Sequence, residues 1–214
     1  MENKIKVVII EDDVTFLKAM VNFINQQEDM VVVGTASNKN DAVCLGKALE
    51  IDLILMDLNL NGNQSDGIFA SLEILEFKKI KIIILTGVED AATIIDSFTA
   101  GAMHYILKEN YLEIPNIIRL LYKNETPFKV LTNEFSRLKK EELLNDLSRP
   151  EKELFYLLEQ NYTQKEIEQL LFKTQNTIKT QIKSILKKLG VKNTKEAVKK
   201  IESKGLMEKS QVHE

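Results

Sequence analysis

Four apolar runs in the first half of the chain each end in a polar residue, and they constrain the fold more than any other feature. The runs cover residues 7–10, 51–56, 82–85 and 105–107, and the polar residues that follow them are Glu11, Asp12, Asp13, Asp57, Thr86 and Lys108. Such runs are typical of strands buried on both faces of a parallel sheet. Because the carboxyl ends of parallel strands form the ligand crevice of an open α/β sheet, we expect these polar side chains to meet.

Strand-like and helix-like segments alternate through residues 1–122. Strands are predicted near residues 5–10, 30–35, 53–57, 80–85 and 104–107. Helices are predicted near residues 14–26, 39–49, 66–76, 90–100 and 112–122. In the first of these helices, one buried face is predicted to consist of Val14, Leu17, Val21 and Ile24. Five β/α units predict an α/β fold with a doubly wound (βα)5 parallel sheet.

The second half of the chain predicts an all-α fold. Residues 123–146 have the composition of a linker, with Pro127 near the start and a helix expected over 133–145. Beyond it the strand signals vanish, and residues 147–210 are predicted to form four helices. The predicted caps are Ser148, Thr163, Thr174 and Thr194 at helix starts and Gly190 at one helix end.

The net charge of −3 conceals a difference between the two halves. Residues 1–122 carry 10 Lys and Arg against 18 Asp and Glu, a net −8, and residues 123–214 carry 19 against 14, a net +5. This asymmetry suggests a cation site in the first half and a polyanionic partner for the second.

Three further features bear on location and redox chemistry. No apolar stretch is long enough to span a membrane, and the N-terminal residues lack the apolar region of a signal peptide, so we expect a cytoplasmic protein without a membrane partner. The single Cys44 excludes an intramolecular disulfide and is predicted to be a small core residue.

The predicted crevice has the composition of a phosphoryl-accepting site. Clustered carboxylates repel one another, and Mg²⁺ suits such a site because it prefers oxygen ligands and leaves room for water and phosphate. Asp57 has the position of a nucleophile, and Lys108 and the Thr86 hydroxyl could contact the phosphoryl oxygens. Each residue alone would more often be a solvated strand end or a turn cap, so the hypothesis rests on the set.

Residues 1–122 resemble the receiver domain of bacterial response regulators. The resemblance rests on four segments at the spacing of that family: Val7–Asp13, Leu53–Asp57, Leu85–Gly87 and Gly101–Lys108. It implies that Asp57 is the phosphoacceptor. The implied magnesium ligands are Glu11, Asp12, Asp57 and the main-chain carbonyl of Asn59. The other implied roles are a switch formed by Thr86 and Tyr105 and a phosphoryl contact from Lys108.

The chain departs from the usual receiver pattern in two places. The segment Asn59–Asp66 is longer and more polar than the Pro-Gly turn that often follows the acceptor, and this difference bears on partner contacts and phosphoryl lifetime. Glu11 stands where many members have Asp, and this is an accepted variant of the acidic pair.

Residues 174–189 predict a helix with one apolar and one basic face. The apolar stripe comprises Ile178, Ile182, Ile185, Leu186 and Leu189, and the opposite face carries Lys179, Thr180, Lys183, Ser184 and Lys187. Residues 173–200 contain nine lysines and one acidic residue. A helix over 164–171 and the short turn Phe172–Thr174 precede it, which is a helix-turn-helix arrangement suited to a DNA groove. For an isolated helix, an ordinary solvated lysine face would be the better interpretation.

The second half also resembles a family, the LuxR-type DNA-binding domain. The matching segments are Leu147–Glu153, Lys165–Ile167, Asn176–Lys179 and Ile185–Val191. The resemblance implies that Lys179, Thr180 and Lys183 face the groove. It assigns DNA-backbone contacts to Lys187, Lys188 and Lys192. Gln181 replaces a common His, and Asn161 replaces a common Gly, which is tolerable because Asn adopts left-handed backbone angles.

Together the two resemblances predict a transcription regulator of the NarL/LuxR subfamily of response regulators. A sensor histidine kinase would phosphorylate Asp57, and phosphorylation would promote dimerisation and binding to promoter DNA, with RNA polymerase as a further partner. Such a protein is no conventional enzyme, although its receiver has the capacity to catalyse its own phosphorylation and dephosphorylation. One alternative is an atypical regulator that binds DNA independently of phosphorylation. A haloacid-dehalogenase-type phosphatase is disfavoured because it needs a second Asp where this chain has Asn59.

Overall fold

The computed structural model describes residues 4–63, 65–123 and 127–206. Contacts divide the chain into two compact units, with the boundary between Ser136 and Arg137, and each unit has its own hydrophobic core. The predicted domain limits at residues 122 and 147 stay predictions. Residues 124–126 of the predicted linker and residues 207–210 of the predicted second domain lie outside the described residues.

The described residues of the first unit form a five-stranded sheet with all strands parallel. Its strands are β1 (Ile5–Ile10), β2 (Met30–Ala36), β3 (Leu53–Met56), β4 (Lys81–Thr86) and β5 (His104–Leu107). In the order β2-β1-β3-β4-β5 the chain starts at β1, next to the central strand β3, and winds outwards in both directions, which confirms the doubly wound fold. Ile10 pairs with Met56, and Met56 pairs with Ile84, so the residues that follow β1 and β3 leave the sheet at the same edge.

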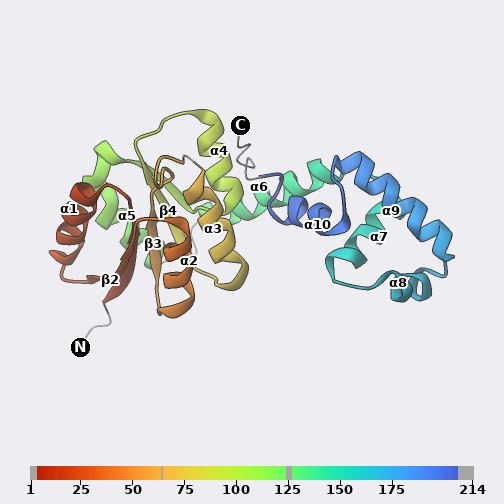
Figure 1. Cartoon of the computed structure of the whole chain (residues 1–214). Helices are drawn as coiled ribbons and strands as arrows, with labels where there is room; N and C mark the ends of the chain where they lie inside the picture. The colour runs from red at the N-terminus through yellow and green to blue at the C-terminus, as the bar shows by residue number, and fades with distance from the viewer. Residues whose placement is uncertain (1–3, 64, 124–126, 207–214) are drawn as a thin grey trace. The chain divides into compact units, whose positions relative to one another are not determined.

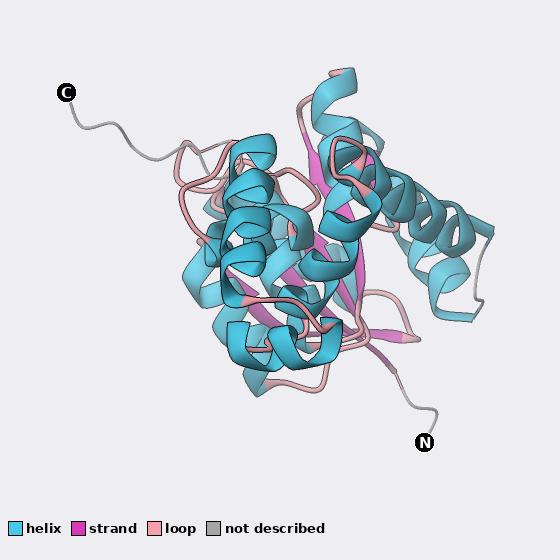
Figure 2. Cartoon of the chain, turned by 90° about the vertical axis from the view of Figure 1, so that its right-hand side faces the viewer, coloured by secondary structure: helices cyan, strands magenta, loops and turns pink. Residues whose placement is uncertain are grey.

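Helices cover both faces of this sheet (Figures 1 and 2). They are α1 (Val14–Asn25), α2 (Lys39–Ala48), α3 (Asp66–Phe77), α4 (Ala91–Ala100), the 3-10 helix η1 (Lys108–Glu113) and α5 (Ile114–Lys123). Alternate strand residues such as Ile9 and Leu55 share a core with Met20 and Ile24 of α1 and with Ile118 of α5. The predicted limits of these strands and helices lie within a few residues of the observed ones. The prediction succeeds because buried positions recur with a different period in strands than in helices, so the two kinds of element can be told apart.

One side chain of the predicted buried face of α1 lies outside the core. Val14 is 58% exposed, whereas Ile24 is fully buried and Leu17 and Val21 are partly buried. The prediction for Val14 is therefore wrong. Val14 is the first helical residue, directly after the cap Asp13, and it lies beyond the part of the helix that packs on the sheet.

The prediction that Cys44 belongs to the core is also wrong. Cys44 is exposed on α2, and the buried residues of that helix are Ala42, Val43 and Gly46. A surface helix buries only one stripe of residues. Because the stripe of α2 runs through Ala42, Val43 and Gly46, position 44 lies on the solvent side.

The described part of the second unit contains helices and no strands. The helices of this half of the chain are α6 (Pro127–Leu144), α7 (Arg149–Glu159), α8 (Gln164–Leu171), α9 (Gln175–Leu189) and α10 (Thr194–Glu202). The helix expected over 133–145 thus begins at Pro127, because proline is tolerated in the first turn, where its missing N–H has no partner to lose. The predicted all-α fold is confirmed, and its core joins α7 to α10 through Phe155, Ile167, Ile185 and Ile201.

The predicted caps hold with one exception. Ser148 and Thr163 form capping boxes, Thr174 caps α9, and Gly190 ends α9 in the left-handed conformation. The exception is Thr194, which is the first helical residue of α10. Asn193 is the cap, since its side chain accepts a hydrogen bond of 2.9 Å from the N–H of Glu196. Asn161 has a positive φ of 63°, as expected for the residue that replaces Gly there.

Candidate functional site: an acidic crevice and a basic helix

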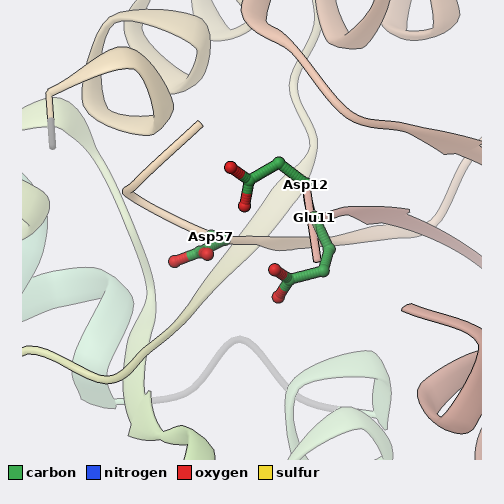
Figure 3. Close-up of side chains that lie close together, drawn as sticks. All are labelled: Glu11, Asp12 and Asp57. Atoms are coloured by element: carbon green, nitrogen blue, oxygen red, sulfur yellow. The ribbon is translucent and has the colours of Figure 1, made fainter. Parts of the chain in front are cut away.

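Glu11, Asp12 and Asp57 lie together at the carboxyl ends of β1 and β3 (Figure 3). Each offers a carboxylate oxygen, and these oxygens all lie within 4.8 Å of one another. Glu11 is 1% exposed and Asp57 is 4% exposed, whereas Asp12 is half-buried. The parallel register of the two strands therefore brings together residues that are 46 positions apart, as the sequence predicts.

Lys108 places its ammonium group against two of these carboxylates. Its Nζ lies 2.8 Å from Asp57 Oδ2 and 2.7 Å from Glu11 Oε2, and it also lies 4.9 Å from the centroid of the Phe16 ring. Burial alone would lower the pKa of Lys108, but its hydrogen bonds to Asp57 and Glu11 outweigh burial and raise that pKa. Lys108 therefore stays protonated and positively charged beside Asp57.

The crevice holds more negative than positive charge. Burial raises the pKa of Glu11 to about 7, with a further increase from the charge of Asp57, although the hydrogen bond from Lys108 lowers it. A divalent cation with oxygen ligands would remove this excess, and three converging carboxylates fit Mg²⁺ by their chemistry. These residues can therefore hold the ion that the resemblance implies.

Thr86 and Tyr105 both contact Val88 in the segment after β4. Thr86 is buried at the end of the strand, and its hydroxyl oxygen accepts a hydrogen bond of 3.4 Å from the Val88 N–H. The Tyr105 hydroxyl donates to the Val88 carbonyl at 2.5 Å. Burial raises the pKa of Tyr105 to about 12, with smaller contributions from neighbouring acids, so the hydroxyl stays protonated and can donate. A movement of Thr86 would thus reach Tyr105 through one residue.

The segment after Asp57 contributes main-chain groups to the site. The Asn59 N–H donates to Asp57 Oδ1 at 3.3 Å. Gly67, which no sequence pattern marked as part of the site, lies where α3 approaches the end of β3. A Cβ at Gly67 would lie 2.0 Å from the Asp57 carbonyl oxygen, so only glycine fits. The sequence signal that could have identified Gly67 is its place in the first turn of a helix, because glycine is a poor helix former and is retained there only for another reason.

Helix α9 buries its predicted apolar stripe, but Ser184, predicted on the opposite face, is part-buried and donates to the buried Glu151 of α7. Ile178, Ile182, Ile185 and Leu189 are buried, and Leu186 packs against the same core. The exposed predicted DNA-contacting residues are Lys179, Thr180, Lys183, Lys187, Lys188 and Lys192. The Thr180 hydroxyl donates to the carbonyl of Asn176 at 2.8 Å, which satisfies it within the helix.

Glu151 is a buried residue of this unit that the sequence suggested only as part of a capping box. It accepts hydrogen bonds from Ser184 Oγ at 2.5 Å, from Lys188 Nζ at 2.6 Å and from the Ser148 N–H at 2.7 Å. Burial would raise the pKa of Glu151, but the hydrogen bonds, first those from Lys188 and Ser184, lower it to about 2. Ser184 and Lys188 therefore hold α9 against the start of α7, in addition to any contact that Lys188 makes with DNA.

Comparison with known proteins assigns both halves of the chain to families. Residues 7–119 match the family described as "Response regulator receiver domain", and residues 145–201 match "Bacterial regulatory proteins, luxR family". The chain is a response regulator. It combines a receiver domain with a LuxR-type DNA-binding domain, as a transcription factor of a two-component system whose partners are a sensor kinase and DNA.

Relatives match this regulator over nearly their whole length. The response regulator protein VraR of Staphylococcus epidermidis is 32% identical over 199 residues, which cover 91% of this chain and 94% of that protein. The transcriptional regulatory protein LiaR of Bacillus subtilis is 36% identical over 201 residues, which cover 90% and 94%. The regulator therefore shares both domains, in the same order, with these relatives.

Solved structures share its fold. RcsB of Salmonella typhimurium superposes with a TM-score of 0.52 at 24% identity, covering 93% of this chain and 98% of that chain. The receiver domain of NarL from Mycobacterium tuberculosis gives a TM-score of 0.53 at 22% identity, covering 57% of this chain and 99% of that chain.

Among the described residues, no helix has both the length and the apolar composition of a membrane span.

Proposed function

We propose that Asp57 is the residue on which the regulator accepts a phosphoryl group from its sensor histidine kinase. The observation that carries this assignment is the contact of a buried Asp57 carboxylate with Lys108, beside two further acids. Glu11, Asp12 and Asp57, with the main-chain carbonyl of Asn59, would hold Mg²⁺. When bound, the ion would neutralise negative charge on the phosphoryl oxygens.

The residues around Asp57 supply the response to phosphorylation. Phosphorylation converts the singly charged Asp57 carboxylate into an acyl phosphate with a charge of about −2. Its oxygens compete for the Lys108 ammonium, which contacts both Asp57 and Glu11 in the unphosphorylated protein. The Thr86 hydroxyl, which accepts from Val88, can turn to donate to a phosphoryl oxygen. Val88 would then lose its hydrogen bond to Thr86 and could move. Because the Val88 carbonyl accepts from the Tyr105 hydroxyl, the segment before α4 would change conformation together with the face formed by α4, β5 and α5.

The basic face of α9 is the proposed DNA-reading surface. Lys179 and Thr180 are exposed in the amino-terminal half of the helix, the part that reads base edges in helix-turn-helix proteins, and Lys183 is exposed just past its middle. Lys187 and Lys192 would contact DNA phosphates. Lys188 already donates one N–H to Glu151, so only its remaining N–H groups could contact a phosphate.

Further properties belong to the same proposal. Phosphorylation would favour a homodimer on paired half-sites, and contact with RNA polymerase would follow at the promoter. The receiver would catalyse its own phosphorylation from small donors and its own dephosphorylation. All of these steps would take place in the bacterial cytoplasm, where promoter DNA lies.

The test compares wild type with Asp57→Ala, using Asp146→Ala as a control that removes an exposed carboxylate from the second unit. Each protein is incubated with acetyl phosphate and Mg²⁺, and phosphoprotein, oligomeric state and footprints on promoter DNA are measured. Wild type and the control should gain all three signals, and Asp57→Ala none. An Asp57→Ala protein that still becomes phosphorylated would refute the acceptor assignment. Equal footprints with and without phosphate in wild type would favour the phosphorylation-independent alternative.

A further inference from the structure

The longer segment after Asp57 folds into a small hairpin. Leu60 and Asn63 form an antiparallel bridge, with hydrogen bonds of 3.3 Å and 3.1 Å between their main-chain groups. The two residues between them have positive φ angles, 54° at Asn61 and 80° at Gly62. Two successive positive φ angles are typical of a type I′ hairpin turn, for which Asn-Gly is the favoured sequence. The added length is therefore an ordered turn.

This hairpin reaches back to the acidic crevice through its main chain. The Asn61 N–H donates to Asp12 Oδ2 at 2.9 Å, across 49 positions of sequence. Two residues earlier, the Asn59 N–H donates to Asp57 Oδ1. One segment thus holds two of the three carboxylates of the site, and it does so with backbone groups whose positions depend only on how the segment folds.

The turn is anchored on both sides. Leu60 is 0% exposed, so the first side of the hairpin is fixed in the core. On the other side, the Asn63 side chain donates to Asp66 at 2.5 Å and accepts from the Ser65 N–H at 3.2 Å, which ties the hairpin to the start of α3. Gly62 itself borders open space, because a Cβ built there would meet nothing within 4 Å.

We propose that the Asn61–Gly62 turn is a positioning element for the metal site, and that it sets the affinity of the regulator for Mg²⁺ by holding Asp12. This inference rests on the proposed Mg²⁺ centre. Without the ion, repulsion from Glu11 and Asp57 drives the half-buried Asp12 towards solvent. The Asn61 N–H opposes that movement and leaves the second carboxylate oxygen available. Loss of a group that orients a metal ligand typically lowers metal affinity by about 10-fold to 100-fold.

The experiment changes backbone preference at Gly62 without introducing a clash. Gly62→Val disfavours the positive φ, whereas Gly62→Asn retains it, and both add a side chain to the same open space. The full chain is titrated with magnesium chloride, and the amide NMR shifts of residues 11–13 and 57–63 are followed. Gly62→Val should weaken Mg²⁺ binding by about 10-fold and shift the Asn61 amide signal before any metal is added, while Gly62→Asn should match wild type.

The outcomes separate this inference from the proposed function. A Gly62→Val protein with wild-type affinity would overturn the positioning role and leave the metal centre intact. A wild type that shows no saturable Mg²⁺ binding would overturn the proposed centre, and the inference with it. Thermal unfolding of each variant checks the fold, and if Gly62→Val does not fold, Gly62→Ala takes its place with the same direction of change.

Discussion

Gly67 leaves no room for a side chain, because the backbones of α3 and of the end of β3 touch there. In Gly67→Ala the added Cβ would have to displace the main chain of Asp57 and Leu58. We expect the free energy of unfolding to fall by about 1–3 kcal/mol, as for other overpacked sites, and the yield of phosphoprotein to fall with it. Chemical denaturation measures the first effect. Gly87→Ala is the matched control, since a Cβ at Gly87 meets nothing within 4 Å; an equal loss in both variants would contradict the explanation.

Phe172 carries a local cost that substitution can remove. It ends α8 in the left-handed conformation, with φ 50° and ψ 41°, and its side chain is 96% exposed, so little packing compensates. Phe172→Asn should raise the free energy of unfolding by about 0.5–1 kcal/mol, because Asn adopts this conformation more readily. Phe172→Ala removes the ring and keeps the strain, so it should give no such gain. If thermal unfolding shows both variants to be less stable than wild type, the ring makes a stabilising contact.

At the scale of elements, the buried Glu151 fixes helix α9 to the start of α7. The folded-state pKa of Glu151 is about 2, below its ordinary value of 4.5, so the folded protein binds fewer protons than the unfolded chain between those pH values. The stabilisation from Glu151 is therefore complete above the ordinary pKa and is lost as the pH falls towards 2.

The variant Glu151→Gln should be less stable than wild type at neutral pH. The difference should shrink as the pH is lowered from roughly 5 to 3, because wild type then loses the interactions of the carboxylate. Denaturant unfolding of the second unit at several pH values measures this. Glu153→Gln, at an exposed position of the same helix, should follow wild type throughout. A constant gap between wild type and Glu151→Gln would show that the carboxylate does not titrate as stated.

At the scale of the whole molecule, the charge is divided between an acidic half of −8 and a basic half of +5. The basic half should bind DNA largely through phosphate neutralisation, so the logarithm of affinity should fall steeply and linearly with the logarithm of salt concentration. Lys179→Ala should weaken binding, and the salt slope should fall by about one if Lys179 contacts a phosphate. Fluorescence anisotropy with promoter DNA measures both. Lys18→Ala, on α1 of the receiver, is the control, and a flat salt dependence in wild type would contradict the assignment.

The sequence by itself determined the order and type of the elements. Continuous apolar runs mark β1, β3 and β4, because a strand buried on both faces is apolar along most of its length. The stripe of α9 follows from helical periodicity. The same rules placed Glu11, Asp57 and Lys108 at one edge of the sheet, since parallel strands end together. For these features the local pattern and the tertiary fold obey the same geometric constraint.

Only the tertiary structure decided which groups touch. Neither the hydrogen bond from Asn61 to Asp12 nor the contact of Glu151 with Lys188 has a local signature, because their partners are 49 and 37 positions apart. Periodicity also failed for Val14 and Cys44, where the packing of neighbouring elements, rather than the helix itself, decides how far the buried stripe extends. Local patterns fix which face of an element is apolar, but the surface against which that face packs is set by contacts between segments distant in sequence.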